Sequence, residues 1–220
     1  LVLITGDRGL AGAYNASMVS RAEAFIKAMN GPVQLITVGR KGRDMLLRRR
    51  KSVLAEFSGL SSSPNFIEAA PIGQLVVDEF LSGNADEIYI AYTEFENMLH
   101  QAPVIRKLLP LEVEYGAAED KHLETTHRTT AVFSYEPGQA ELLNEIIPRF
   151  TALQIYQSIL SAQASEHAAR MVAMRNATDS AKDLISVLQL EYNKVRQTTN
   201  TNDMLDIAGG AEALDRASAS

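Results

Sequence analysis

The hydrophobic and polar positions divide the chain into two parts that follow different periods. In the first part, short apolar runs alternate with helical patterns and with loops rich in Gly, Ser and Pro. The apolar runs predict strands at residues 1–5, 33–38, 53–57, 88–92 and 131–134, the helical pattern covers residues 17–29 and 72–81, and residues 58–65 and 115–128 have loop composition. Strands that alternate with helices of this length predict an α/β fold with a Rossmann-like, mostly parallel sheet covered on both faces.

The second part predicts one very long helix. All seven prolines lie at or before Pro148, and residues 149–208 contain neither proline nor glycine. Sixty residues without a helix breaker are unusual, since helices of globular proteins run about 8–20 residues. We therefore expect an α/β domain at residues 1–137 and a long C-terminal helix at residues 138–220, with the segment after Gly209 and Gly210 frayed.

The long helix carries a seam of small or apolar positions. From Ala164 to Thr199 these positions recur at alternating intervals of three and four residues, a period of 3.5 that is typical of a coiled coil. The seam comprises Ala164, His167, Met171, Met174, Thr178, Ala181, Ile185, Leu188, Tyr192, Val195 and Thr199. Toward the N-terminus the pattern continues through Leu153, Tyr156 and Leu160, with a local stutter.

The predicted helix is too long to be covered by the rest of the chain. At 1.5 Å per residue, sixty residues reach roughly 90 Å, whereas about 150 residues fold into a ball with a radius near 15 Å. The seam therefore needs a partner helix, either upstream of Leu1 or in another protein. Because the sequence opens inside an apolar strand and without Met, we expect Leu1 to be the edge of a fragment.

Composition and charge exclude several classes of protein. The formal net charge of −6 argues against nucleic-acid binding, and the absence of cysteine excludes a disulfide framework, a thiolate metal site and a cysteine nucleophile. No apolar run is long enough to cross a bilayer. His122 and His127 lie in an acidic loop without a fixed third ligand, so we expect no metal site. The basic run at residues 48–51 is expected to be a solvated helix face.

The glycines at residues 6–12 raise the possibility of a nucleotide site. A glycine turn between a strand and a helix is the arrangement that cradles phosphate in nucleotide-binding enzymes, and the basic residues at 40–41 lie where an NADPH enzyme holds the 2′-phosphate. However, no tyrosine has a lysine four residues on, and Asp7 and Arg8 crowd the turn. We expect these glycines to serve tight turns and packing and expect no cofactor, and an NADPH-dependent reductase is the weaker alternative.

Three stretches carry a family resemblance. Residues 164–197, ASEHAARMVAMRNATDSAKDLISVLQLEYNKVRQ, resemble the C-terminal helix of the gamma subunits of F-type ATP synthases. ITGDRGLAGAYN resembles the first strand and turn of that family, and FENMLHQAPVIRKLLPL resembles its central domain. The resemblance implies an antiparallel coiled coil, formed with a helix upstream of Leu1, above a Rossmann-like foot domain. It also implies a non-catalytic central-stalk rotor subunit that couples proton-driven rotation to ATP synthesis.

The resemblance further implies partners and contact residues. The partners would be the alpha and beta subunits of the hexamer, the epsilon subunit and the membrane c-ring, at the cytoplasmic face of the bacterial plasma membrane and without direct membrane insertion. Arg196, Gln197 and Thr201 match family positions that touch the catalytic beta subunits, and Arg170 matches a position near the acidic lever of that subunit. A coiled-coil scaffold or adaptor, whose α/β domain docks a partner, remains the alternative from another class.

Overall fold

The computed structural model describes residues 1–111 and 139–218, which form two compact units, Leu1–Val172 and Ala173–Ser220. The predicted loop at residues 115–128, with His122 and His127, and the predicted strand at residues 131–134 lie outside the described residues. The division into functional domains at residue 137 remains a prediction.

A five-stranded sheet forms the centre of the first unit. Its strands are β1 (Val2–Ile4), β2 (Ile36–Val38), β3 (Ala55–Phe57), β4 (Ile88–Phe95) and β5 (Gln101–Leu109), in the order β3-β2-β1-β4-β5. β1, β2, β3 and β4 pair in parallel, and β5 pairs antiparallel with β4, so the prediction of a mostly parallel sheet is confirmed. The sequence patterns did not predict β5, because Pro103 and the charged pair Arg106 and Lys107 interrupt its apolar run.

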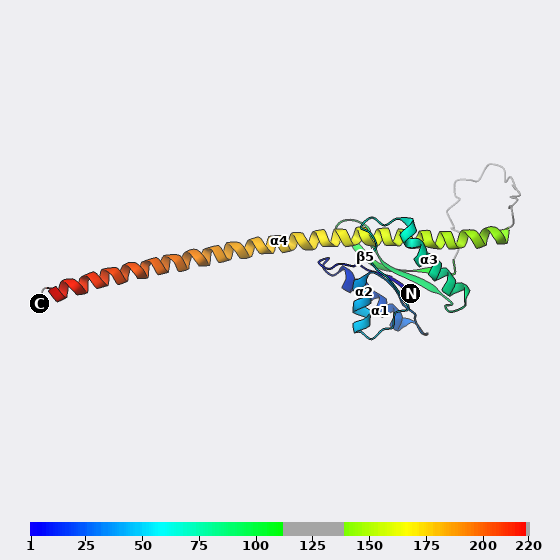
Figure 1. Ribbon diagram of the computed structural model, residues 1–220, viewed down its shortest axis with the longest axis horizontal. Helices are drawn as coiled ribbons and strands as arrows, with labels where there is room; N and C mark the ends of the chain where they lie inside the picture. Colours follow the sequence, from blue (N-terminus) through cyan, green and yellow to red (C-terminus); the bar gives the residue numbers. More distant parts are fainter. Residues whose placement is uncertain (112–138, 219–220) are drawn as a thin grey trace, which may run out of the picture. The chain divides into compact units, whose positions relative to one another are not determined.

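Helices cover both faces of this sheet (Figure 1). They are α1 (Tyr14–Ala28), α2 (Arg40–Arg48), α3 (Phe66–Leu81) and α4 (Gln139–Ser218). Alternate side chains of β1 point to opposite faces: Leu3 joins a core with α1 and α2, whereas Val2 and Ile4 join a core with α3 and α4. α3 begins six residues before the predicted start, because the side chain of Asn65 caps it by accepting a hydrogen bond from the backbone N–H of Glu68.

Two glycines permit close approaches that a side chain would block. Gly39, between β2 and α2, has φ of +101°, and a Cβ there would lie 2.1 Å from the carbonyl oxygen of Thr5. Gly73 of α3 lies against α4, where an added Cβ would be 2.7 Å from the Cβ of Ala152. The first approach seats the β2–α2 turn beside the end of β1, and the second lets α3 and α4 pack closely.

The C-terminal helix α4 runs for 80 residues and includes Pro148. It continues through Gly209 and Gly210, so the prediction of fraying after these glycines is wrong in this structure. Each helical glycine costs only about 1 kcal/mol relative to alanine, and the neighbouring Ala, Glu, Leu and Arg residues are good helix formers. The prediction of one very long helix after an α/β domain is confirmed.

Candidate functional site: the two faces of the long helix

One face of α4 is buried on the sheet. Its members lie one or three residues apart and are small or aliphatic, and three of them carry hydroxyl groups. They are Thr151, Ala152, Ile155, Ser158, Ile159, Ala162, Ser165 and Ala168. Ile155, Ile159 and Ala162 belong to the same hydrophobic core as α3 and the strands. This stripe anchors residues 151–168 of α4 in the first unit.

The opposite face of α4 is exposed, although many of its side chains are apolar. Leu153, Leu160 and Met171 keep 42%, 40% and 48% of their surface accessible. The predicted seam positions Ala164 and His167, which lie between them in the repeat, are exposed as well. Over this part of α4 the helix therefore has two apolar stripes, one on the sheet and one free.

Tyr156 does not belong to the exposed seam. Its hydroxyl donates a hydrogen bond to the carbonyl oxygen of Pro64 at 3.3 Å, and its ring packs edge-on against Phe66 with the ring centroids 6.0 Å apart. The exposed side chain at this level is that of Gln157. With Gln157 in place of Tyr156 the intervals between Leu153 and Leu160 become four and three, so the predicted stutter is wrong and the repeat is regular.

The seam positions of the second unit are also exposed. Residues 173–218 are helical throughout, and Met174, Thr178, Ala181, Ile185, Leu188, Tyr192 and Val195 are all accessible. Ile185 and Tyr192 keep 64% and 62% of their surface exposed. Large apolar side chains repeated along a helix face indicate an interaction surface. Whether an antiparallel helix covers this surface remains a prediction.

The three predicted beta-subunit contacts nearest the C-terminus lie together on α4. Arg196, Gln197 and Thr201 are all exposed, and the hydroxyl of Thr201 donates a hydrogen bond to the carbonyl oxygen of Gln197 at 2.8 Å. Among the residues that the structure describes, none forms an ion pair with Arg196. Its guanidinium group is thus open to a carboxylate on a partner.

Arg170, the fourth predicted contact, lies in the first unit and is engaged there. It forms an ion pair with Glu166, one helical turn before it, and its Nε donates a hydrogen bond to the carbonyl oxygen of Gly9 at 3.4 Å. Only a quarter of its side chain is exposed. The structure therefore separates Arg170 from the other three residues, and its contact with a beta subunit remains a prediction.

The glycine turn at residues 6–12 lies against α4. In a parallel sheet of this order, ligands bind at the carboxyl ends of β1 and the neighbouring strand β4. Here the hydroxyl of Ser165 donates a hydrogen bond to the carbonyl oxygen of Thr93 at this edge, at 3.1 Å. Gly6 faces Glu166 so closely that an added Cβ would lie 2.6 Å from the carboxylate carbon. A cavity of about 410 Å³ remains at this edge, and Glu166, His167 and Arg170 of α4 form one of its walls.

Two carboxylates and their arginine partners lie at the turn. Asp7 accepts hydrogen bonds from the backbone N–H groups of Arg40 and Gly59, each at 2.8 Å, so its charge already binds the N-terminus of α2. Glu166 adds a second negative charge beside Gly6. Arg40 pairs with Asp7 and Arg170 pairs with Glu166, so both arginines already have anionic partners within the chain, which favours the packing interpretation of the glycines over cofactor binding.

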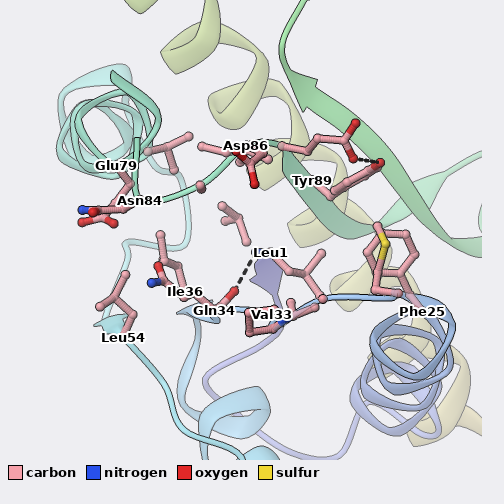
Figure 2. A pocket seen from close by; sticks show the side chains of 18 residues that line it. Leu1, Phe25, Val33, Gln34, Ile36, Leu54, Glu79, Asn84, Asp86 and Tyr89 are labelled. Atoms are coloured by element: carbon pink, nitrogen blue, oxygen red, sulfur yellow. Dashed lines mark hydrogen bonds between the residues drawn. The ribbon is translucent and has the colours of Figure 1, made fainter. Parts of the chain in front are cut away.

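A second cavity of about 450 Å³ lies near the amino ends of β1, β2 and β4. Figure 2 shows apolar side chains such as Leu1, Phe25 and Ile36 on its walls, with Glu79 and Asp86 among the polar ones. Its lining includes no histidine, cysteine, lysine or arginine. This set of groups offers neither a nucleophile activated by a base nor a cation for an anionic substrate.

Within residues 1–111 and 139–218, no group of three His, Asp or Glu side chains is placed to hold a metal ion. In the same part of the chain, no helix combines the length and the apolar character needed to cross a membrane.

Comparisons with known proteins agree with this architecture. A family model described as ATP synthase matches residues 1–214. The ATP synthase gamma chains of Roseiflexus castenholzii and Chloroflexus aurantiacus are 42% and 44% identical over 217 residues, which is 97% of this chain and 72% of each relative.

Solved structures show the same fold. The central stalk and c-ring assembly of the Tetrahymena thermophila mitochondrial ATP synthase contains a chain with a TM-score of 0.64 and 27% identity, covering 80% of this chain and 75% of that one. A chain of the Euglena gracilis mitochondrial ATP synthase has a TM-score of 0.70 at 19% identity, covering 97% and 71%. These similarities agree with the sheet and with the long helix that has a free apolar face. The chain therefore belongs to the family of ATP synthase gamma chains.

Proposed function

We propose that this protein is the central-stalk rotor subunit of an F-type ATP synthase and couples proton-driven rotation to ATP synthesis. The observation that carries the proposal is the apolar face of α4, which is repeated every 3.5 residues and stays exposed from Leu153 to Val195. Such a face is suited to a second helix. Membership of the gamma-chain family gives no support to the reductase and adaptor alternatives.

The partner of this face, in our proposal, is a helix of the same protein upstream of Leu1, and the pair forms an antiparallel coiled coil. The small residues Ala164, Thr178 and Ala181 would let the two helix axes approach closely. The larger Ile185, Leu188 and Tyr192 would supply most of the apolar area buried in the second unit. In this proposal, residues 138–220 form the shaft and residues 1–137 form the foot domain.

The subunit would act without catalytic residues of its own. The carboxylates of Asp7 and Glu166 at the glycine turn are paired with Arg40 and Arg170, and the second cavity lacks a nucleophile with a base. Rotation of an asymmetric shaft can change nucleotide affinity only through contacts that differ between the catalytic sites. Arg196, Gln197 and Thr201 would provide such contacts to the beta subunits, and Arg170 would become a further one if its ion pair with Glu166 opened.

The proposed assembly also defines the remaining partners and the location. The shaft would lie within the hexamer of alpha and beta subunits, and the foot domain would bind the epsilon subunit and the c-ring. That arrangement places the protein at the cytoplasmic face of a bacterial plasma membrane as a peripheral subunit, without inserting into the bilayer.

Co-expression with the alpha and beta subunits of the same source tests this function. The full-length protein is expected to co-purify with both subunits, and the complex, once bound to vesicles that contain the c-ring and the rest of the membrane sector, is expected to drive proton uptake by ATP hydrolysis. A matched variant with Leu188→Asp and Val195→Asp, on the exposed seam, is expected to reduce assembly, whereas Asp183→Ala, outside the seam, is not. Purification of the full-length protein free of both subunits would contradict the proposal.

A further inference from the structure

The hydrogen bonds between α4 and the sheet form a connected set. Tyr14, at the start of α1, donates its hydroxyl proton to the carbonyl oxygen of Ala162 at 2.9 Å. Ser165, fully buried, donates to the carbonyl oxygen of Thr93 at the end of β4 at 3.1 Å. Both bonds join a side chain to a backbone carbonyl and lie among buried groups. Directional bonds of this kind fix position more strictly than apolar packing does.

Further contacts of the same stretch reach other loops. Ser161 accepts a hydrogen bond from the backbone N–H of Phe95 at 3.0 Å, and Gln163 donates to the carbonyl oxygen of Ser61 at 2.9 Å. Residues 161–165 of α4 are thus bound to α1, to the end of β4 and to the loop before α3. These three attachments surround one and a half turns of helix.

The geometry has a mechanical consequence. Rotating α4 by one residue turns its side chains by about 100°, and sliding it by one turn moves it about 5.4 Å. The apolar members of its buried face, such as Ile155 and Ile159, would tolerate repacking better than the polar ones, because apolar contacts are non-directional. Either movement would break the bonds of Tyr14 and Ser165 together. The carboxylate of Glu166 lies directly against Gly6 and would also lose this position.

We propose that Tyr14, Ser165 and the seat of Glu166 on Gly6 form a clamp that fixes α4 in rotation and register on the sheet, so that this helix and the α/β domain turn together. The clamp residues are positioning residues for rotary coupling, and this inference rests on the proposed function. Without them, torque applied to α4 would be lost as slippage of the helix on the sheet.

The experiment uses the full-length protein reassembled with its alpha and beta subunits on membrane vesicles that contain the c-ring and the rest of the membrane sector. The test variant combines Tyr14→Phe with Ser165→Ala, and a control variant removes the same two kinds of hydroxyl as Tyr89→Phe with Ser186→Ala. The control hydroxyls bond Glu87 and Asp183. ATP hydrolysis and proton uptake are measured on the same vesicles.

The test variant is expected to hydrolyse ATP within about twofold of the unaltered protein while protons pumped per ATP fall roughly threefold or more, because two buried directional contacts are lost. The control is expected to keep the original ratio. Ser165→Cys, which retains a weak donor, is expected to give an intermediate ratio. This change in the ratio of pumping to hydrolysis is not expected from a loss of stability alone, which would lower both rates.

The possible results distinguish a failure of the clamp proposal from a failure of the proposed rotor function. Unchanged pumping per ATP in an assembled test variant would overturn the clamp. If the double variant does not assemble, the single variants Tyr14→Phe and Ser165→Ala are measured, and an unchanged ratio in both overturns it equally. Failure of the unaltered protein to assemble or pump would instead contradict the proposed rotor function.

Discussion

The hydroxyl of Tyr14 and the carbonyl oxygen of Ala162 lie 2.9 Å apart, although 148 residues separate them in the chain. The bond joins the first residue of α1 to the middle of the buried face of α4. Burial, and secondarily the charge of Glu166, raise the pKa of Tyr14 well above its ordinary value of 10, so the phenol remains a hydrogen-bond donor at physiological pH. The contact therefore ties the two ends of the described α/β unit together.

Removing this hydroxyl should destabilise the first unit modestly. We expect Tyr14→Phe to lower the free energy of unfolding by about 0.5–1.5 kcal/mol, because one hydrogen bond is lost while the ring stays packed. Denaturant unfolding followed by circular dichroism measures the change. Tyr89→Phe, whose hydroxyl bonds the exposed Glu87, is the control and is expected to change little. Equal stability of Tyr14→Phe and the unaltered protein would show that the bond contributes nothing net.

The same residue predicts a dependence on alkaline pH. Because the folded protein holds the Tyr14 proton more tightly than the unfolded chain does, the unfolded chain loses it first as the pH rises above about 10. The stability contributed by this shift is therefore fully present below pH 10 and is lost as the pH rises further. We expect the unaltered protein to lose stability more steeply than Tyr14→Phe between pH 9.5 and 11, roughly the range in which the unfolded tyrosine titrates. Parallel curves would contradict the assignment.

The close approach of α3 and α4 offers a reciprocal test. Gly73→Ala places a methyl group 2.7 Å from the Cβ of Ala152, so we expect overpacking to cost about 1–3 kcal/mol of unfolding free energy. Ala152→Gly removes the opposing methyl group and should recover much of this loss in the double variant. Thermal unfolding of the unaltered protein, the two single variants and the double variant measures the coupling between the two sites. Additive effects would mean that the two helices separate readily at this point.

Hydrogen exchange should distinguish the two parts of α4 in the isolated chain. Residues 151–168 are buried on the sheet, and we expect their amides to be protected. Residues 178–199 have almost entirely exposed side chains in the described structure, and a helix without tertiary contacts is only marginally stable. We expect their amides to exchange within minutes and to become protected in the assembled complex. Full protection of both segments in a monomer would contradict the need for a partner helix.

The predicted contacts near the C-terminus can be tested by activity. In the assembled complex we expect Arg196→Ala with Gln197→Ala to lower ATP turnover up to about tenfold, which corresponds to about 1.4 kcal/mol in the barrier. Assembly should survive, because both side chains lie outside the seam. Lys194→Ala, a neighbouring exposed cation, is the control. Normal turnover of the double variant would remove these residues from the set of functional contacts.

Much of the architecture follows from local patterns. The apolar runs that form β1, β2, β3 and β4 and the breaker-free stretch that forms α4 could be identified because strands and helices impose their own periods on the sequence. β5 escaped prediction because it pairs at the sheet edge beside β4, where Pro103 and exposed charged residues are tolerated. Of the candidate site, the regular seam was visible in the sequence from Ala164 onward.

The sequence by itself determined that an α/β domain precedes a long helix with a repeated apolar face, since both depend on neighbours only a few residues apart. Only the tertiary structure decided which second face of α4 is buried, that Tyr156 turns toward Pro64 while Gln157 stays exposed, and that Glu166 lies against Gly6. These choices depend on contacts between residues about a hundred or more positions apart, and no local period records which distant backbone a side chain will meet.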